Sequence, residues 1–259
     1  MGATWTSPDR TVLEPLFRST TRGQSIISSI LGLGLGTIKV DSEREPRVAL
    51  LLYPPLNFIG GELSAANESG ILEDFPQGNL LLVPDETWES HLRSIWGEDL
   101  KVIHRTRMSA GHLSIKQLRK LKRPLPKGFE LKQLDSWLLE RTNANLKAHV
   151  SMFWSSPQDF LAKGFGFCIV HGEEVVSMAS TFIPFVRDFE IQVDTMDSPT
   201  YRRKGFATAA CIALIEHGLK NGFVPCWDAD NEVSVKLALK LGYTDPDSYK
   251  AYVRWKTPQ

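Results

Sequence analysis

The stretch YRRKGFATAA, residues 201–210, places three cations directly before a glycine and then changes to small apolar residues. The cations are Arg202, Arg203 and Lys204. Like charges in a row repel one another, so this arrangement favours a strongly negative ligand at that point. From Phe206 onward apolar residues recur at helical spacing, and Asn221-Gly222 predicts where the helix ends. We therefore predict a glycine loop that leads into a helix N-terminus.

A helix that begins here would be suited to an anion. The first N–H groups of a helix have no partner within it, and the helix dipole favours negative charge beside them. Gly205 lets the backbone come close to a ligand, Ala207 leaves the first turn unobstructed, and Thr208 adds a hydroxyl. The segment is predicted to be a phosphate cradle, although a solvated basic loop before an ordinary helix would have the same composition.

Predicted strands lie on both sides of this segment. FEIQVDT (189–195) runs into the loop, and FVPCWDA (223–229) follows the helix. Asp230 or Asn231 can cap a second helix, which Gly242 ends. The buried face of that helix is predicted to contain Val233, Leu237, Ala238 and Leu241.

In this context the sequence resembles the GNAT superfamily of acyl-CoA-dependent N-acyltransferases. The pyrophosphate signature of that family is Arg or Gln, two residues, Gly, one residue, then Gly or Ala, which residues 202–207 match. A later family pattern is an Asn, a helix and a Leu-Gly-aromatic ending, matched by Asn231, Ser234 and Leu241-Gly242-Tyr243. The resemblance covers about residues 124–256. It is closer to an uncharacterised bacterial-type branch with an extra N-terminal domain.

The resemblance implies that acetyl-CoA, as co-substrate, lies between the strands FEIQVDT and FVPCWDA. Backbone groups near Val193 would pair with the pantetheine arm and polarise the thioester carbonyl. The N–H groups from Arg203 to Thr208 would hold the pyrophosphate, with Asn231 and Ser234 on the far side of the arm. The predicted cofactor-binding residues are Val193, Asp194, Thr195, Arg202, Arg203, Lys204, Gly205, Phe206, Ala207, Thr208, Asn231 and Ser234.

The catalytic residues are less defined. Glu190 is the candidate base, because a carboxylate in an otherwise apolar strand could take the proton of an attacking amine; alternatively it faces solvent or pairs with Arg187. Many family members place an acidic tyrosine where this chain has Ala238. A thiolate leaving group with a pKa near ~8.5 tolerates that loss. Tyr243, Tyr249 or Ser234 could substitute for the missing acid.

Composition limits the remaining classes of protein. The chain has 259 residues, of which 42% are hydrophobic, and 30 basic residues balance 30 acidic ones. A neutral chain has no general field for nucleic acid. Three scattered cysteines predict neither disulfides nor a metal site and favour a cytoplasmic protein. The longest apolar run, Val48 to Leu52, is too short to span a membrane.

Two prolines and a glycine in KRPLPKG (122–128) predict a domain boundary. We expect an α/β (α+β) protein with a smaller β/α domain over residues 1–122, which could be a degenerate GNAT-like half. Residues 123–259 would form the GNAT domain, with a mixed sheet flanked by helices.

The predicted function is transfer of an acetyl or short acyl group from acetyl-CoA to an unidentified primary amine by direct attack. The alternatives are a non-catalytic CoA-binding or scaffolding protein, and nucleotide binding at the glycines of GLGLG (32–36). The sequence leaves the oligomeric state open, and a homodimer is compatible with it.

Overall fold

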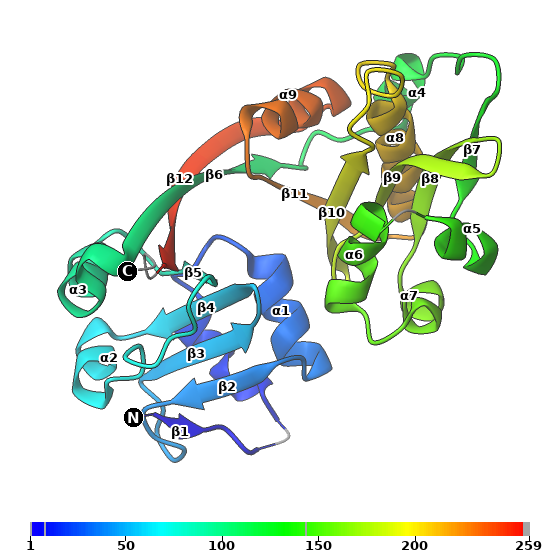
Figure 1. The fold of residues 1–259 in the computed structure, drawn as a ribbon. Coiled ribbons are helices and arrows are strands. Elements are labelled where there is room, and N and C mark those ends of the chain that lie inside the picture. Colours follow the sequence, from blue (N-terminus) through cyan, green and yellow to red (C-terminus); the bar gives the residue numbers. More distant parts are fainter. Residues whose placement is uncertain (1, 8, 143, 256–259) are drawn as a thin grey trace. The chain divides into compact units, whose positions relative to one another are not determined.

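The computed structural model describes residues 2–7, 9–142 and 144–255, and Figure 1 shows their helices and strands. Two compact units make up the chain: the first comprises residues 1–105 and 248–259, and the second residues 106–247. Each contains a sheet with helices, so the predicted mixed α/β class is confirmed. In the part of the chain that the structure describes, no helix is long and apolar enough to cross a membrane.

The sheet of the first unit has the strand order β1-β2-β3-β4-β5-β12. Only β4 and β5 are parallel among these neighbours, and the other pairs are antiparallel. Trp88, Leu92 and Trp96 are buried along one face of α3, as their four-residue spacing predicts. The elements are β1 (Ala3–Thr4), η1 (Thr11–Phe17), α1 (Gln24–Leu33), β2 (Thr37–Val40), β3 (Val48–Tyr53), β4 (Leu56–Gly61), α2 (Leu63–Ser69), β5 (Leu80–Leu82), α3 (Thr87–Trp96) and η2 (Gly97–Asp99), with the end of β12 (Thr244–Arg254).

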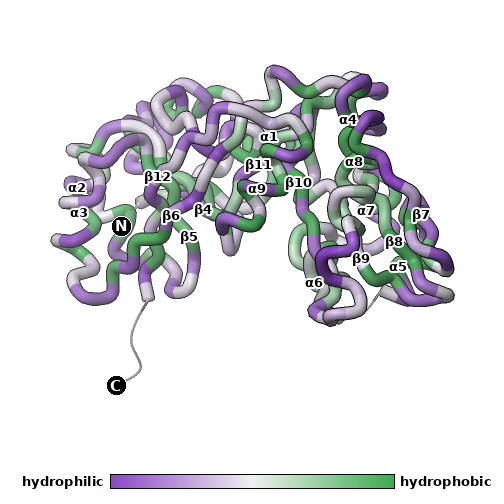
Figure 2. Tube along the Cα trace, turned by 90° about the horizontal axis from the view of Figure 1, so that it is seen from above, coloured by the Kyte–Doolittle hydropathy of each residue, from purple (hydrophilic) through white to green (hydrophobic). Residues whose placement is uncertain are grey.

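The sheet of the second unit has the order β7-β8-β9-β10-β11-β6, in which only β10 and β11 are parallel. Its long helix α8 is hydrophobic along the tube of Figure 2 and contacts β8, β9, β10 and β11. The elements are the end of β6 (Leu100–Ser109), α4 (Ile115–Leu121), β7 (Phe129–Gln133), α5 (Ser136–Arg141), α6 (Ala144–Phe153), α7 (Pro157–Lys163), β8 (Gly166–His171), β9 (Glu174–Thr181), β10 (Asp188–Thr195), α8 (Phe206–Lys220), β11 (Val224–Ala229) and α9 (Glu232–Leu241).

The two units repeat one strand pattern: three antiparallel neighbours, one parallel neighbour, then one antiparallel neighbour. The last strand of each pattern comes from the other half of the chain. β6 follows α3 in sequence but pairs with β11, and β12 follows α9 but pairs with β5. Each half of the sequence therefore completes the sheet that the other half begins.

This exchange explains why the division between the units differs from the predicted boundary at residues 122 and 123. The division falls within β6, between Arg105 and Thr106, and again within β12. The proline-rich segment 122–128 connects α4 to β7, and both elements belong to the second unit. The prolines thus interrupt a connection inside one unit.

We predict that cutting the chain in this connection leaves its halves associated. A protease site inserted between Arg123 and Pro124 would give one fragment with β6 and another with β12, and each fragment carries a strand that the other sheet needs. The cleaved protein should elute as one species in gel filtration. Its thermal unfolding should be compared with that of the uncut insertion variant. Separation of two folded fragments without denaturant would contradict the exchange of strands.

Candidate functional site

The neighbouring strands β10 and β11 pair over a short length and then part. Their parallel ladder joins Asp188 to Val224, Phe189 to Pro225 and Glu190 to Cys226. Beyond it, β10 continues to pair with β9 on its other side, and Trp227–Ala229 of β11 pair with β6. The sheet of the second unit therefore has a divergence that starts at Glu190 and Cys226.

Alternate residues of β10 turn their peptide groups toward this divergence. Phe182 donates its N–H to the carbonyl of Glu190 at 2.9 Å, so even-numbered residues of β10 face β9. The carbonyl of Arg187, an odd-numbered position, accepts the N–H of Val224 across the β11 side at 3.2 Å. By this alternation Ile191 and Val193 direct their N–H and C=O groups into the divergence.

The last peptide of β10 is held at both ends. The carbonyl of Asp194 accepts the Ser177 hydroxyl at 3.1 Å, and the N–H of Thr195 donates to the Asp194 carboxylate at 2.7 Å. Ser177 Oγ also lies 2.8 Å from Thr195 Oγ1. Of the three predicted backbone partners of pantetheine, Val193 therefore presents both its peptide groups to the divergence, whereas Asp194 and Thr195 engage groups of the protein.

The loop before α8 has the backbone that its sequence predicts. Arg203 has φ of 60° and Gly205 of 83°, both in the left-handed region. Gly205 is the N-cap of α8, and no side chain caps the helix there. The first helical bond runs from the N–H of Ala209 to the carbonyl of Gly205 at 3.0 Å, so the N–H groups of residues 206–208 precede it. A Cβ on Gly205 would meet nothing within 4 Å, so the space beside it is open.

The three cations of this loop differ in their partners. Arg202 forms an ion pair with Asp197 at 2.9 Å. Arg203 and Lys204 are exposed, and among the described residues neither has an acidic group within the 4.0 Å of an ion pair. Two positive charges therefore stand beside the first turn of α8 without an acidic partner in that part of the protein.

Aromatic packing fixes the start of the helix. The buried ring of Phe206 lies 4.6 Å from that of Phe129 in β7, which stacks on His171 at 4.4 Å. Tyr201 lies edge-on to Phe129 at 6.2 Å and donates its hydroxyl to Glu174 at 3.2 Å. The loop is therefore attached to β7 and to the β8–β9 turn, and Phe206 can reach a ligand only through its backbone.

Glu190 is 9% exposed and lies at the last rung before the strands part. The preceding residue, Phe189, packs against Gly218 of α8, so Glu190 turns to the opposite face of the sheet. α8 therefore covers the face that carries Phe189, and Glu190 lies on the other face of the sheet.

Two predicted residues of α9 contribute to the helix itself. Asn231 is its N-cap, and its side-chain oxygen accepts the N–H of Ser234 at 2.9 Å. The hydroxyl of Ser234 accepts the indole N–H of Trp227 at 3.0 Å. Because that bond uses only a lone pair of the hydroxyl, the Ser234 O–H is still able to donate.

Tyr243 is buried, at 1% exposure, and donates its hydroxyl to the carbonyl of Pro225 at 3.1 Å. Burial, with the nearby Cys211, Cys226 and Glu190, raises the pKa of Tyr243 well above its usual value. Its ring packs 5.4 Å from that of Trp227, and Ala238 is fully buried in the same cluster. This geometry favours a packing role for Tyr243 over that of the missing acid.

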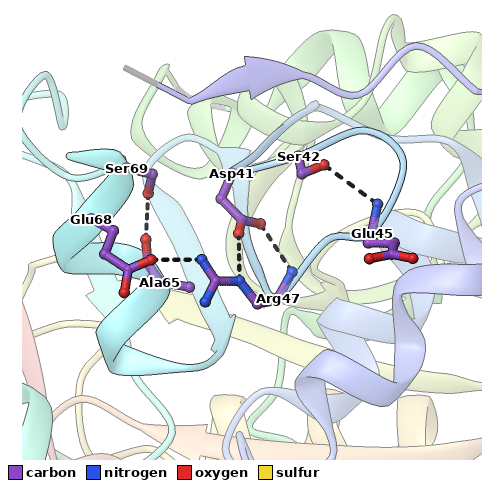
Figure 3. A pocket seen from close by; sticks show the side chains of 7 residues that line it. All are labelled: Asp41, Ser42, Glu45, Arg47, Ala65, Glu68 and Ser69. Carbon is purple, nitrogen blue, oxygen red and sulfur yellow. Dashed lines mark hydrogen bonds and ion pairs between the residues drawn. The ribbon is translucent and has the colours of Figure 1, made fainter.

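A hollow of about 440 Å³ lies in the first unit. Figure 3 shows Arg47 in this hollow, between Asp41 at 3.4 Å and Glu68 at 2.7 Å. Because the arginine pairs with both carboxylates, the hollow offers an anionic ligand no unpaired guanidinium. The residues that line it are Asp41, Ser42, Glu45, Arg47, Ala65, Glu68 and Ser69.

Sequence reasoning missed two residues at the site, Ser177 and Lys240. Lys240 donates to Thr208 Oγ1 at 3.2 Å from a different helix. Both contacts are tertiary, and no local pattern in the sequence marks them. Within the described ranges, no three His, Cys, Asp or Glu side chains are grouped so that they could hold a metal ion.

Comparisons with known proteins identify the family of this chain. A family model described as GNAT acetyltransferase matches residues 14–252. The uncharacterised N-acetyltransferase YdfB of Bacillus subtilis is 33% identical over 174 residues, which cover 66% of this chain and 64% of the relative. This chain thus spans just under two thirds of that relative's length.

Solved structures show the same fold. A GCN5-related N-acetyltransferase-like protein from Streptococcus suis superposes with a TM-score of 0.80 at 28% identity, covering 95% of this chain and 98% of the other. A tandem GNAT protein from the clavulanic acid biosynthesis pathway gives a TM-score of 0.55 at 12% identity over 97% and 93% of the two chains, which shows likeness of fold alone. The resemblance read from residues 202–207 and 231–243 is thereby confirmed, and the chain belongs to the GNAT acetyltransferase family.

Proposed function

We propose that this chain transfers an acetyl or short acyl group from acyl-CoA to a primary amine, and that the second unit carries the site. The single observation that supports this most is the divergence of β10 and β11 at Glu190 and Cys226, next to the uncapped N-terminus of α8. The divergence offers peptide groups to an extended pantetheine arm. The N-terminus of α8 offers N–H groups and nearby cations to phosphates.

The described residues fit acyl-CoA. Ile191 and Val193 would pair with the pantetheine arm, and the N–H groups before Ala209 would bind the pyrophosphate. Arg203 and Lys204 add positive charge at that point, and the open space beside Gly205 leaves room for it. Acyl-CoA supplies an activated thioester when bound, and the protein's part is to orient it and to accept or donate protons.

Glu190 would act as the base that removes the proton of the attacking amine. Its carboxylate turns to the face of the sheet opposite α8 and lies at the point where the thioester would approach the strands. A carboxylate accepts the proton directly or through one water. Ser234, whose O–H is able to donate, would stabilise the departing thiolate, since the family's tyrosine position is Ala238.

We further propose that the first unit is a degenerate copy of the second and holds no acyl-CoA. In the matching ladder of β4 and β5 the last rung joins Phe58 to Leu82, so a phenyl ring stands where the second unit has Glu190. Ile59 follows Phe58 as Ile191 follows Glu190, and its carbonyl accepts the buried Thr20 hydroxyl at 3.1 Å. α2 has only 7 residues and follows β4 after Glu62, with no cradle loop between them.

The rival function is a protein that binds CoA without catalysis. Such a protein would have the same cradle as an enzyme but would not transfer the acyl group. Release of CoA thiol in the presence of a panel of primary amines separates the two functions, because a binding protein would release none. The cytoplasmic location and the primary amine as the class of acceptor stay predictions.

We predict that Gly205→Glu weakens acetyl-CoA binding by about tenfold or more in calorimetry, because a negative side chain enters the phosphate site. The wild type should bind one acetyl-CoA per chain. Gly222→Glu is the matched control: it lies at the other end of α8, has φ of 78°, and its Cβ would also meet nothing within 4 Å. Both variants pay a similar backbone cost, roughly 1–2 kcal/mol. Equal affinities in the two variants would contradict the cradle.

We predict that Glu190→Gln lowers turnover by roughly 10²- to 10⁴-fold with little change in acetyl-CoA affinity. The deficit should shrink as the pH rises, since more of the amine is then unprotonated. Asp188→Asn, two residues earlier on the same strand face, is the control and should keep its turnover. Wild-type turnover in Glu190→Gln at neutral pH, or a larger loss in Asp188→Asn, would place the base elsewhere.

A further inference from the structure

Lys240 reaches from α9 to the start of α8. It lies in the last turn of α9, and its ammonium group donates to the hydroxyl of Thr208 at 3.2 Å. Thr208 belongs to the first turn of α8, the turn whose N–H groups precede the first helical bond. A side chain distant in sequence therefore brings a fourth cation to the cradle.

The position is unfavourable for a cation when no anion is present. A positive charge beside a helix N-terminus is destabilising, because the helix dipole places positive charge there as well. The Thr208 hydroxyl is a neutral partner and does not offset the charge. In the described part of the chain, no carboxylate lies within ion-pair distance of Lys240, whereas Lys236, one turn earlier on α9, pairs with Glu232 at 3.5 Å.

Among the residues that the structure describes, the other cations near the start of α8 also lack acidic partners, with the exception of Arg202. Arg202 is engaged by Asp197, so its charge is already compensated. Arg203 and Lys204 directly precede the first turn of α8 in the chain, and Lys240 reaches Thr208 from α9. Three cations thus lie near N–H groups that themselves favour negative charge, and a doubly charged pyrophosphate would relieve this repulsion.

We propose that Lys240 is a binding residue for the pyrophosphate of acyl-CoA. This inference rests on the proposed function, because it assumes that acyl-CoA occupies the cradle of the second unit. The ammonium group is a mobile point charge on a long side chain, so it can leave Thr208 and meet a phosphate oxygen nearby. Lys240 then adds a cation from α9 to those that the loop of residues 202–205 supplies.

A purely structural role makes a different prediction. A lysine in the last turn of α9 also stabilises that helix through its own dipole. Loss of that interaction would lower stability and would affect every substrate equally. Loss of a pyrophosphate contact affects only ligands that contain the pyrophosphate.

The test compares Lys240→Gln with Lys236→Gln, which removes the same charge from the same helix. In calorimetry, Lys240→Gln should weaken acetyl-CoA binding by about 5- to 20-fold, and Lys236→Gln by less than about 2-fold. With acetyl-pantetheine, a thioester that lacks the phosphates, Lys240→Gln should keep the wild-type kcat/KM. Lys240→Arg keeps the charge and should retain most of the affinity for acetyl-CoA.

Three results would overturn the inference. One is equal affinity for acetyl-CoA in Lys240→Gln and Lys236→Gln while the wild type binds it. Another is an equal loss of kcat/KM for acetyl-CoA and acetyl-pantetheine in Lys240→Gln, which would assign the residue to structure. If the wild-type protein itself fails to bind acetyl-CoA, the proposed function fails, and the role of Lys240 fails with it.

Discussion

The site depends on one feature of strand pairing, the short parallel ladder that ends at Glu190 and Cys226. A backbone amide inside a sheet normally has a partner strand, and exposing such groups without one is costly. β9 holds one edge of β10 and β6 holds the end of β11, so the two strands can part without losing their place in the sheet. The groups exposed between them are suited to an extended, amide-containing ligand.

Because β6 and β12 are exchanged, the N-terminal half has a structural role that does not depend on catalysis. β6 supports β11 at Trp227–Ala229, the part of that strand that diverges from β10. The first unit in turn receives β12 beside β5. A half that had lost its ligand site would still be required, because without β6 the diverging end of β11 has an unpaired edge.

The sequence predicted what is local and missed what is tertiary. Gly205, the helix after it and the cap at Asn231 were predictable because each is set by neighbouring residues. The strand exchange joins residues far apart in the chain, and local signals such as the prolines near 122 do not reveal it. Val233 fits the apolar spacing of α9 but is 77% exposed, because it lies in the first turn, where the helix has few neighbours. Likewise, the burial of Tyr243 and its bond to Pro225 depend on how α9 meets β11, which spacing does not reveal.

We propose that acyl-CoA occupies the divergence of β10 and β11 in the second unit, and that the matching place in the first unit is closed. Amide hydrogen exchange with and without acetyl-CoA tests both parts in one measurement. We expect slower exchange at residues 191–193 and 203–208 when acetyl-CoA is present, and no change at residues 56–62. Protection of residues 56–62, or unchanged exchange at 203–208 under saturating acetyl-CoA, would contradict it.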